Sequence, residues 1–167
     1  MSPATVSVVI PCRDQRSDVL EALESVFAQT VPALEVIVID DGSSDGSGDA
    51  VRERFGSRVR VLRAECGCAS GARNVGWRAA SGTWIAFLDA DDLWSPAKLE
   101  VAMAMLRDAT DAVWFCSDGE YRSLDGVLHP SWFDLHVDVR EPYVGSPLEA
   151  LFGINFVLGV ATGLTME

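Results

Sequence analysis

The sequence predicts an α/β domain in which a mostly parallel sheet carries helices on both faces. Short apolar runs rich in β-branched residues alternate with segments of helical periodicity, and strands that alternate with helices favour parallel pairing. Two of these runs end in acidic clusters, Asp40-Asp41 and the stretch FLDADD at 87–92. The 167 residues show no internal repeat or interdomain linker, so residues 1–167 are expected to form one domain.

Five strands are expected, and their order along the chain is 6–10, 34–39, 59–62, 84–88 and 112–116. The first two, VSVVI and LEVIVI, are nearly continuous apolar runs. Such runs are typical of strands that are covered on both faces, as in a parallel sheet between two layers of helices.

Four helices are expected between and after these strands. Ser17 is a candidate N-cap for a helix whose apolar residues recur at helical spacing through Phe27. A weaker helix is expected near 50–55 and another around 72–80. The dipeptide Ser95-Pro96 is a cap followed by proline at the first helical position, which predicts a helix through about Leu106.

The charge of the chain restricts its partners. The formal net charge is −12, and only one of the 13 basic residues is a lysine, Lys98. This balance argues against a nucleic-acid partner, because phosphate binding needs a clustered basic face. It permits the binding of divalent cations.

Cysteines and apolar segments bear on localisation. The four cysteines show neither a CxxC pair nor zinc-ligand spacing, which favours reduced thiols in a cytoplasmic protein. The first residues lack the positive region of a signal peptide. The apolar stretch 151–164 is interrupted by Asn155 and is shorter than the roughly 20 residues of a spanning helix. We expect it to be buried strand and loop, and peripheral contact with a membrane stays open.

The acidic clusters are expected to face one crevice. In open sheets of this kind, ligands bind beyond the carboxyl ends of the strands, and both clusters lie at such ends. Carboxylates as close as Asp89, Asp91 and Asp92 repel one another, and a metal ion, hydrogen bonds or water could each offset that repulsion. Asp40 is expected to hydrogen-bond its own turn, and Asp45 to be solvated.

Three other nucleotide or phosphate sites fit less well. The first strand is followed by PCRDQR rather than the GxGxxG of a dinucleotide site, and Lys98 has no P-loop glycines before it. A phospho-accepting signalling domain also places aspartates at strand ends. It would need a lysine after its fifth strand, whereas Lys98 lies on the helix that follows Asp89.

Five motifs follow one another in order along the chain: VSVVIP at 6–11, VIDDGSSDGS at 38–47, GARNVG at 71–76, SGTWIAFLDADD at 81–92 and W-S-P-x-K-L at 94–99. Together they resemble glycosyltransferase family 2, which has the GT-A fold. The resemblance covers about residues 5–106. It implies transfer of a sugar from a UDP-, dTDP- or GDP-linked donor to an acceptor hydroxyl, with Mn2+ or Mg2+ holding the diphosphate as a Lewis acid.

The resemblance also implies roles for particular residues. Asp91 of the DXD element would be a metal ligand, and Asp89 would contact the metal or the ribose. Asp41 would accept a hydrogen bond from the base, and Arg73 would contact base or diphosphate. The residues expected to contact the nucleotide sugar are Pro11, Arg13, Asp41, Arg73, Asp89, Ala90 and Asp91. The chain departs from the family where Cys12, Arg13 and Asp14 replace an aromatic-Asn pair.

The catalytic base of the family is expected beyond Glu167. Asp118, in the stretch CSDGEY, is a candidate to replace it. The alternative function is a nucleotide-sugar-binding module without turnover. Asp92 is expected either to lie beside the metal or to cap the helix that begins near Ser95.

Overall fold

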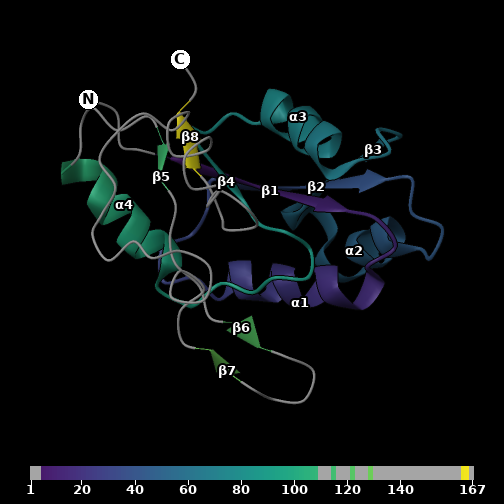
Figure 1. Cartoon of the computed structure of the whole chain (residues 1–167), viewed down its shortest axis with the longest axis horizontal. Coiled ribbons are helices and arrows are strands. Elements are labelled where there is room, and N and C mark those ends of the chain that lie inside the picture. The colour runs from purple at the N-terminus through teal and green to yellow at the C-terminus, as the bar shows by residue number, and fades with distance from the viewer. Residues whose placement is uncertain (1–4, 109–113, 116–120, 123–127, 130–162, 166–167) are drawn as a thin grey trace.

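The computed structural model describes residues 5–108, 114–115, 121–122, 128–129 and 163–165 (Figure 1). Its main sheet has the strand order β3-β2-β1-β4-β8-β5, and β6 pairs with β7 separately. The strands are β1 (Val6–Cys12), β2 (Glu35–Asp41), β3 (Arg60–Ala64), β4 (Trp84–Phe87), β5 (Trp114–Phe115), β6 (Tyr121–Arg122), β7 (Leu128–His129) and β8 (Gly163–Thr165). The helices are α1 (Arg16–Phe27), α2 (Ser47–Phe55), α3 (Ala69–Ala79) and α4 (Lys98–Asp108), with a 3-10 turn, η1, at Gly56–Arg58.

The four strands of residues 6–87 form the parallel part of the sheet. β1 pairs with β2 on one side and with β4 on the other, and β3 extends the sheet beyond β2. β8 runs antiparallel to both β4 and β5. Every residue of β1 is buried, as its continuous apolar run predicts for a central strand. The predicted α/β class with a mostly parallel sheet is therefore confirmed.

Helices cover both faces of the sheet, as predicted. On one face, α1, α2 and α4 pack against alternate residues of β1 and β2, with Leu23, Val51 and Leu99 among the buried side chains. On the other face, α3 packs on the sheet through Ala72 and its partly buried neighbour Val75 (Figure 1). These two apolar layers hold the strands, and with them the strand ends, in place.

The loops after β1 and β2 are tied together by side chains. The backbone N–H of Asp14 donates to Ser43, and the Asp14 carboxylate accepts from both the N–H and the hydroxyl of Ser44. The N–H of Gln15 donates to the Ser47 hydroxyl at 3.2 Å. Asp14 holds a left-handed backbone with φ of 52°, a conformation that aspartate tolerates better than most residues.

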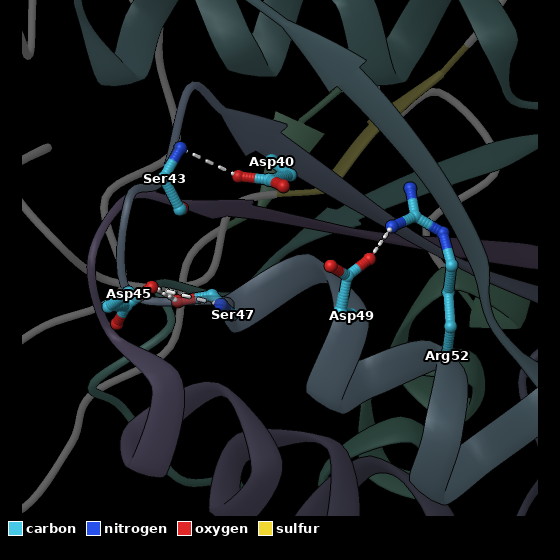
Figure 2. Close-up of polar contacts among 6 residues, drawn as sticks. All are labelled: Asp40, Ser43, Asp45, Ser47, Asp49 and Arg52. Carbon is cyan, nitrogen blue, oxygen red and sulfur yellow. Dashed lines mark hydrogen bonds and ion pairs between the residues drawn. The ribbon is translucent and has the colours of Figure 1, made fainter.

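Asp45 is exposed, as expected, but it is also part of the same network, which was not expected. One carboxylate oxygen accepts from the N–H and hydroxyl of Ser47 (Figure 2). The other accepts from the N–H of Arg16 at 3.0 Å. Asp40 accepts from the N–H of Ser43 at 2.9 Å, which confirms that it bonds its own turn. The hydroxyl of Ser47 is the largest cause that lowers the pKa of the Asp45 carboxyl.

This network explains why α1 begins before the predicted Ser17. The N-cap is Gln15, whose own side chain makes no capping bond. The first N–H groups of a helix lack partners within the helix, and here Ser47 and Asp45 from the following loop accept from Gln15 and Arg16. A cap that comes from another segment leaves no local motif in the sequence.

The remaining boundaries shift by a few residues. α4 begins at Lys98 after a turn in which the Lys98 N–H donates to the Ser95 carbonyl, so Pro96 precedes the helix and Asp92 does not cap it. Of the strand predicted at 112–116, the structure describes only β5, Trp114–Phe115. Of the apolar stretch 151–164, only the end that enters β8 lies within the described residues.

None of the described helices is long and apolar enough to cross a membrane.

Gly76 brings α3 close to the sheet. A Cβ atom at this position would lie 2.2 Å from Cγ1 of Val9 and 3.3 Å from Cγ1 of Ile39, both in buried strands. Real non-bonded carbons do not approach so closely, so any larger residue forces α3 away from the strands.

We predict that Gly76→Ala lowers the free energy of unfolding by about 1–3 kcal/mol, because overpacking α3 against β1 outweighs the better helix propensity of alanine. Urea unfolding followed by circular dichroism measures this difference. Arg78→Ala, an exposed change on the same helix, is the control and is expected to change stability by less than about 0.5 kcal/mol. Equal stability of Gly76→Ala and the parent chain would contradict the close packing.

We predict that Asp45→Asn costs about 1 kcal/mol at neutral pH, since an amide has one acceptor oxygen where the carboxylate uses two. The lowered folded-state pKa means that this stabilisation is present above the ordinary aspartate pKa of about 3.9 and is lost as the pH falls below it. The variant should therefore lose less stability on acidification than the parent chain. Urea midpoints between about pH 6 and pH 3 measure both effects.

The exposed Glu21→Gln on α1 is the matched control for Asp45→Asn, because it removes one carboxylate outside the network. It should unfold like the parent chain at neutral pH. An Asp45→Asn chain that matches the parent at every pH would show that the network contributes nothing to stability.

Candidate functional site

The candidate site lies at the carboxyl edge of the parallel strands. Cys12 at the end of β1 pairs in register with Asp40 at the end of β2, and the N–H of Leu88, just after β4, donates to Val9 of β1. The ends of β2 and β4 therefore flank the end of β1. This arrangement puts both acidic clusters on one edge, as the sequence predicts for parallel strands.

Asp41 is the last residue of β2 and is 4% exposed. Its Oδ1 atom accepts from the backbone N–H of Cys66 and, at 3.3 Å, from the N–H of Gly67. A buried carboxylate needs such donors to offset its lost hydration. Asp41 thereby holds the segment between β3 and α3 against the end of β2, a role that the sequence did not indicate.

Arg73 on α3 forms an ion pair with Asp89, the second residue after β4. Both side chains are partly buried, about a third exposed. An arginine in such a place offsets part of the repulsion among the carboxylates of FLDADD. This partner adds to the metal ion, hydrogen bonds or water that the sequence left open. The pair also joins α3 to the end of β4, and α3 follows the segment that Asp41 holds.

The FLDADD stretch ends β4 in a tight turn. The N–H of Asp92 donates to the Asp89 carbonyl at 3.0 Å, and Ala90 is buried at the corner. Asp91 is exposed, and its carboxylate takes part in no hydrogen bond or ion pair among the described residues. Partial withdrawal from water, with repulsion from Asp89 and Asp91, raises the pKa of Asp92 to about 6.

Pro11 and Arg13, which were expected to contact the nucleotide sugar, lie on the same edge. Pro11 is buried in β1, where it pairs in register with Ile39, and Arg13 is exposed in the loop that follows. The buried aromatic residues Trp84, Phe87 and Trp94 belong to the core. Asp118 lies outside the described residues.

The described part of the chain holds no group of three histidine, cysteine or acidic side chains arranged to bind a metal ion by themselves. Asp91 is available to a cation, whereas Asp89 is held by Arg73. Sequence reasoning missed the roles of Ser47, Asp45 and Cys66. Their bonds join segments that are distant in sequence, so no local spacing signals them.

Comparison with known proteins identifies the family of this arrangement. The model of the family "Glycosyl transferase family 2" matches residues 7–153. Among curated relatives, the Escherichia coli UDP-Glc:alpha-D-GlcNAc-diphosphoundecaprenol beta-1,3-glucosyltransferase WfgD is 38% identical over 107 residues, which cover 64% of this chain and 42% of that protein. The uncharacterized glycosyltransferase EpsJ of Bacillus subtilis is 35% identical over 87% of this chain and 38% of its own length.

Solved structures show the same fold. Staphylococcus aureus TarS 1–349 in complex with UDP-GlcNAc has a TM-score of 0.58 at 28% identity, over 64% of this chain and 32% of that one. The mannosyltransferase PcManGT from Pyrobaculum calidifontis, in complex with GDP-Man and Mn2+, has a TM-score of 0.60 at 29% identity, over 71% of this chain and 37% of that one. The chain thus spans less than half the length of each of these relatives. It belongs to glycosyl transferase family 2 and has the GT-A fold.

Proposed function

We propose that the carboxyl edge of the sheet binds a nucleotide-diphosphate sugar together with a divalent cation, and that the protein transfers the sugar to an acceptor hydroxyl. The observation that carries this proposal is the exposed Asp91 carboxylate beside the Arg73–Asp89 ion pair at the end of β4. A cation site and a guanidinium side by side suit a diphosphate, which needs positive charge on several oxygens.

The residues present fit Mn2+ or Mg2+. Both are hard cations that prefer oxygen ligands, and Mg2+ typically uses one or two protein carboxylates while phosphate oxygens and water supply the others. Asp91 would be the first such ligand, and Asp89 the second if Arg73 turns to the diphosphate. The cation would act as a Lewis acid on the leaving diphosphate. That PcManGT is described with GDP-Man and Mn2+ supports this assignment.

The remaining residues would bind and orient the donor. Asp41 would accept a hydrogen bond from the nucleobase, at the point where it also holds Cys66 and Gly67. Pro11, Arg13 and Ala90 would line the same edge as the donor. Because UDP-GlcNAc and GDP-Man each appear with structural relatives, we leave UDP-, dTDP- and GDP-linked sugars as donor classes.

Transfer would break the bond between the anomeric carbon and the diphosphate oxygen while the acceptor oxygen bonds to that carbon. A carboxylate must take the acceptor proton, and Asp118 is our candidate within this sequence. The reaction would take place in the cytoplasm, either free in solution or in peripheral contact with a membrane. The acceptor is a sugar, lipid or protein hydroxyl.

A second candidate function is donor binding without turnover, because no catalytic base is assigned among the described residues. Incubation of the chain with UDP-glucose or GDP-mannose and Mn2+, followed by assay of released UDP or GDP, distinguishes the two. Release above the uncatalysed background that falls by about 10²-fold or more in Asp118→Asn would support catalysis by that residue. Tight donor binding with no release would favour the binding module.

We predict that nucleotide binding depends on the metal and that Asp91→Asn removes most of this dependence. The parent chain should bind UDP or GDP at least about tenfold more tightly with Mn2+ than with a chelator, since Asp91 would share the cation with the diphosphate. Isothermal titration calorimetry measures the affinities. Glu53→Gln, an exposed carboxylate on α2, is the control and should keep the full dependence. If the parent chain binds UDP or GDP with equal affinity in Mn2+ and in chelator, the proposed metal site is contradicted.

We predict that Asp41→Ala weakens binding of the nucleoside without metal by roughly 10- to 100-fold, the usual range for a hydrogen bond to a charged group. Titration of uridine and guanosine in the presence of chelator measures this effect. Asp49→Ala, an exposed aspartate on α2, is the matched control. Cooperative urea unfolding checks that each variant is folded. A folded Asp41→Ala chain with unchanged nucleoside affinity would remove Asp41 from the base site.

A further inference from the structure

The segment between β3 and α3 places two thiols close together beside the candidate site. Cys66 and Cys68 are both free, and Gly67 between them has a left-handed φ of 71°. A Cβ atom built at Gly71 would lie 3.3 Å from Sγ of Cys68 and 3.5 Å from Sγ of Cys66. The two sulfur atoms therefore border the same small space over the first turn of α3.

Glycine at position 71 keeps that space open. A Cβ there would lie 2.7 Å from the Cβ of Cys66, closer than non-bonded carbons approach. Cys68 is exposed and Cys66 partly exposed, so reagents in solution reach this part of the molecule. Cys12, by contrast, is buried, and its burial raises the pKa of its thiol to about 11.

The two thiols differ in reactivity. Cys68 is the N-cap of α3, where its sulfur accepts from the N–H of Gly71 at 3.4 Å and lies 3.4 Å from the Ser70 hydroxyl. The Ser70 hydroxyl and then this N–H lower the pKa of the Cys68 thiol. Partial burial and the Asp41 carboxylate raise the pKa of the Cys66 thiol. Because the thiolate is the nucleophile, Cys68 should react first.

We propose that Cys66 and Cys68 form a dithiol that low-molecular-weight disulfides oxidise to an intramolecular disulfide. The Cys68 thiolate attacks one sulfur of the small disulfide, forms a mixed disulfide and releases one small thiolate. Cys66 then loses its proton to solvent and attacks the Cys68 sulfur, and the second small thiolate leaves. The two protein thiols are oxidised, and the small disulfide is reduced to two thiols.

Closure of this disulfide changes the segment that Asp41 holds. The N–H groups of Cys66 and Gly67 donate to Asp41, and a bond between the neighbouring sulfurs constrains the same backbone. This part of the inference rests on the proposed role of Asp41 in nucleotide binding. Oxidation is then expected to weaken nucleotide binding, and reduction to restore it.

The test of closure uses glutathione disulfide and does not depend on nucleotide binding. Trypsin cleaves after Arg63 and Arg73, so one peptide, 64–73, carries both cysteines. In a Cys116→Ser chain treated under native conditions and digested without reductant, we expect this peptide to be lighter by two hydrogen atoms. Either cysteine carrying a stable glutathione, two free thiols, or a disulfide between chains would overturn the proposal.

Single variants test the order of the two steps. Cys66→Ser should accumulate glutathione on Cys68, because no thiol remains to displace it. Cys68→Ser should react roughly tenfold or more slowly, because only the less acidic Cys66 thiol remains. Faster reaction of Cys68→Ser than of Cys66→Ser would overturn the assignment of Cys68 as the first nucleophile.

Calorimetry with UDP or GDP and Mn2+ then tests the coupling. The oxidised chain should bind at least about fivefold more weakly than the reduced chain, and dithiothreitol should restore the affinity. Unchanged affinity in a chain whose peptide 64–73 carries the disulfide would overturn the coupling. If neither form binds nucleotide while the disulfide still forms, the proposed function fails, the coupling fails with it, and the dithiol stands.

Discussion

The pairing of β1 on both of its edges is the constraint on which the candidate site depends. β1 pairs with β2 and with β4, and all three strands run in the same direction. Their carboxyl ends therefore meet at one edge, although Asp41 and Asp89 are far apart in sequence. The apolar layers of α3 on one face and of α1, α2 and α4 on the other keep this register. A slip of β1 would move every residue of the site.

Side-chain bonds across the strand ends then fix the loops. Asp14 and Asp45 join the loop after β1 to the loop after β2, Asp41 holds the segment before α3, and Arg73 joins α3 to Asp89. Carboxylates supply most of these links, so some of the acidic residues behind the net charge of −12 have a structural role. Asp91 stays outside the network. The site thus combines loops held by side-chain bonds with the exposed carboxylate of Asp91, an arrangement that suits the binding of a charged ligand.

Patterns local in sequence predicted β1 to β5, the four α-helices and the position of the acidic clusters, but not β6 or β7. VSVVI and LEVIVI could be predicted as strands, because burial on both faces demands continuous apolar residues. The start of α1, the role of Asp45 and the Arg73–Asp89 pair were not predictable in this way. Each depends on a partner from another segment, and only the folded chain brings the partners together. The family motifs located Arg73 and Asp89 without indicating that they bind each other.

We propose that one edge of the sheet, held by β1, binds the nucleotide diphosphate. The most direct test is nuclear magnetic resonance mapping of backbone amide shifts as UDP or GDP is added with Mg2+. We expect the large shifts to fall in four segments, 12–16, 41–47, 65–73 and 88–92, which come together only at this edge. Shifts concentrated at the amino ends of the strands, around 5–7 and 81–84, or spread evenly over the chain, would contradict binding at the carboxyl edge.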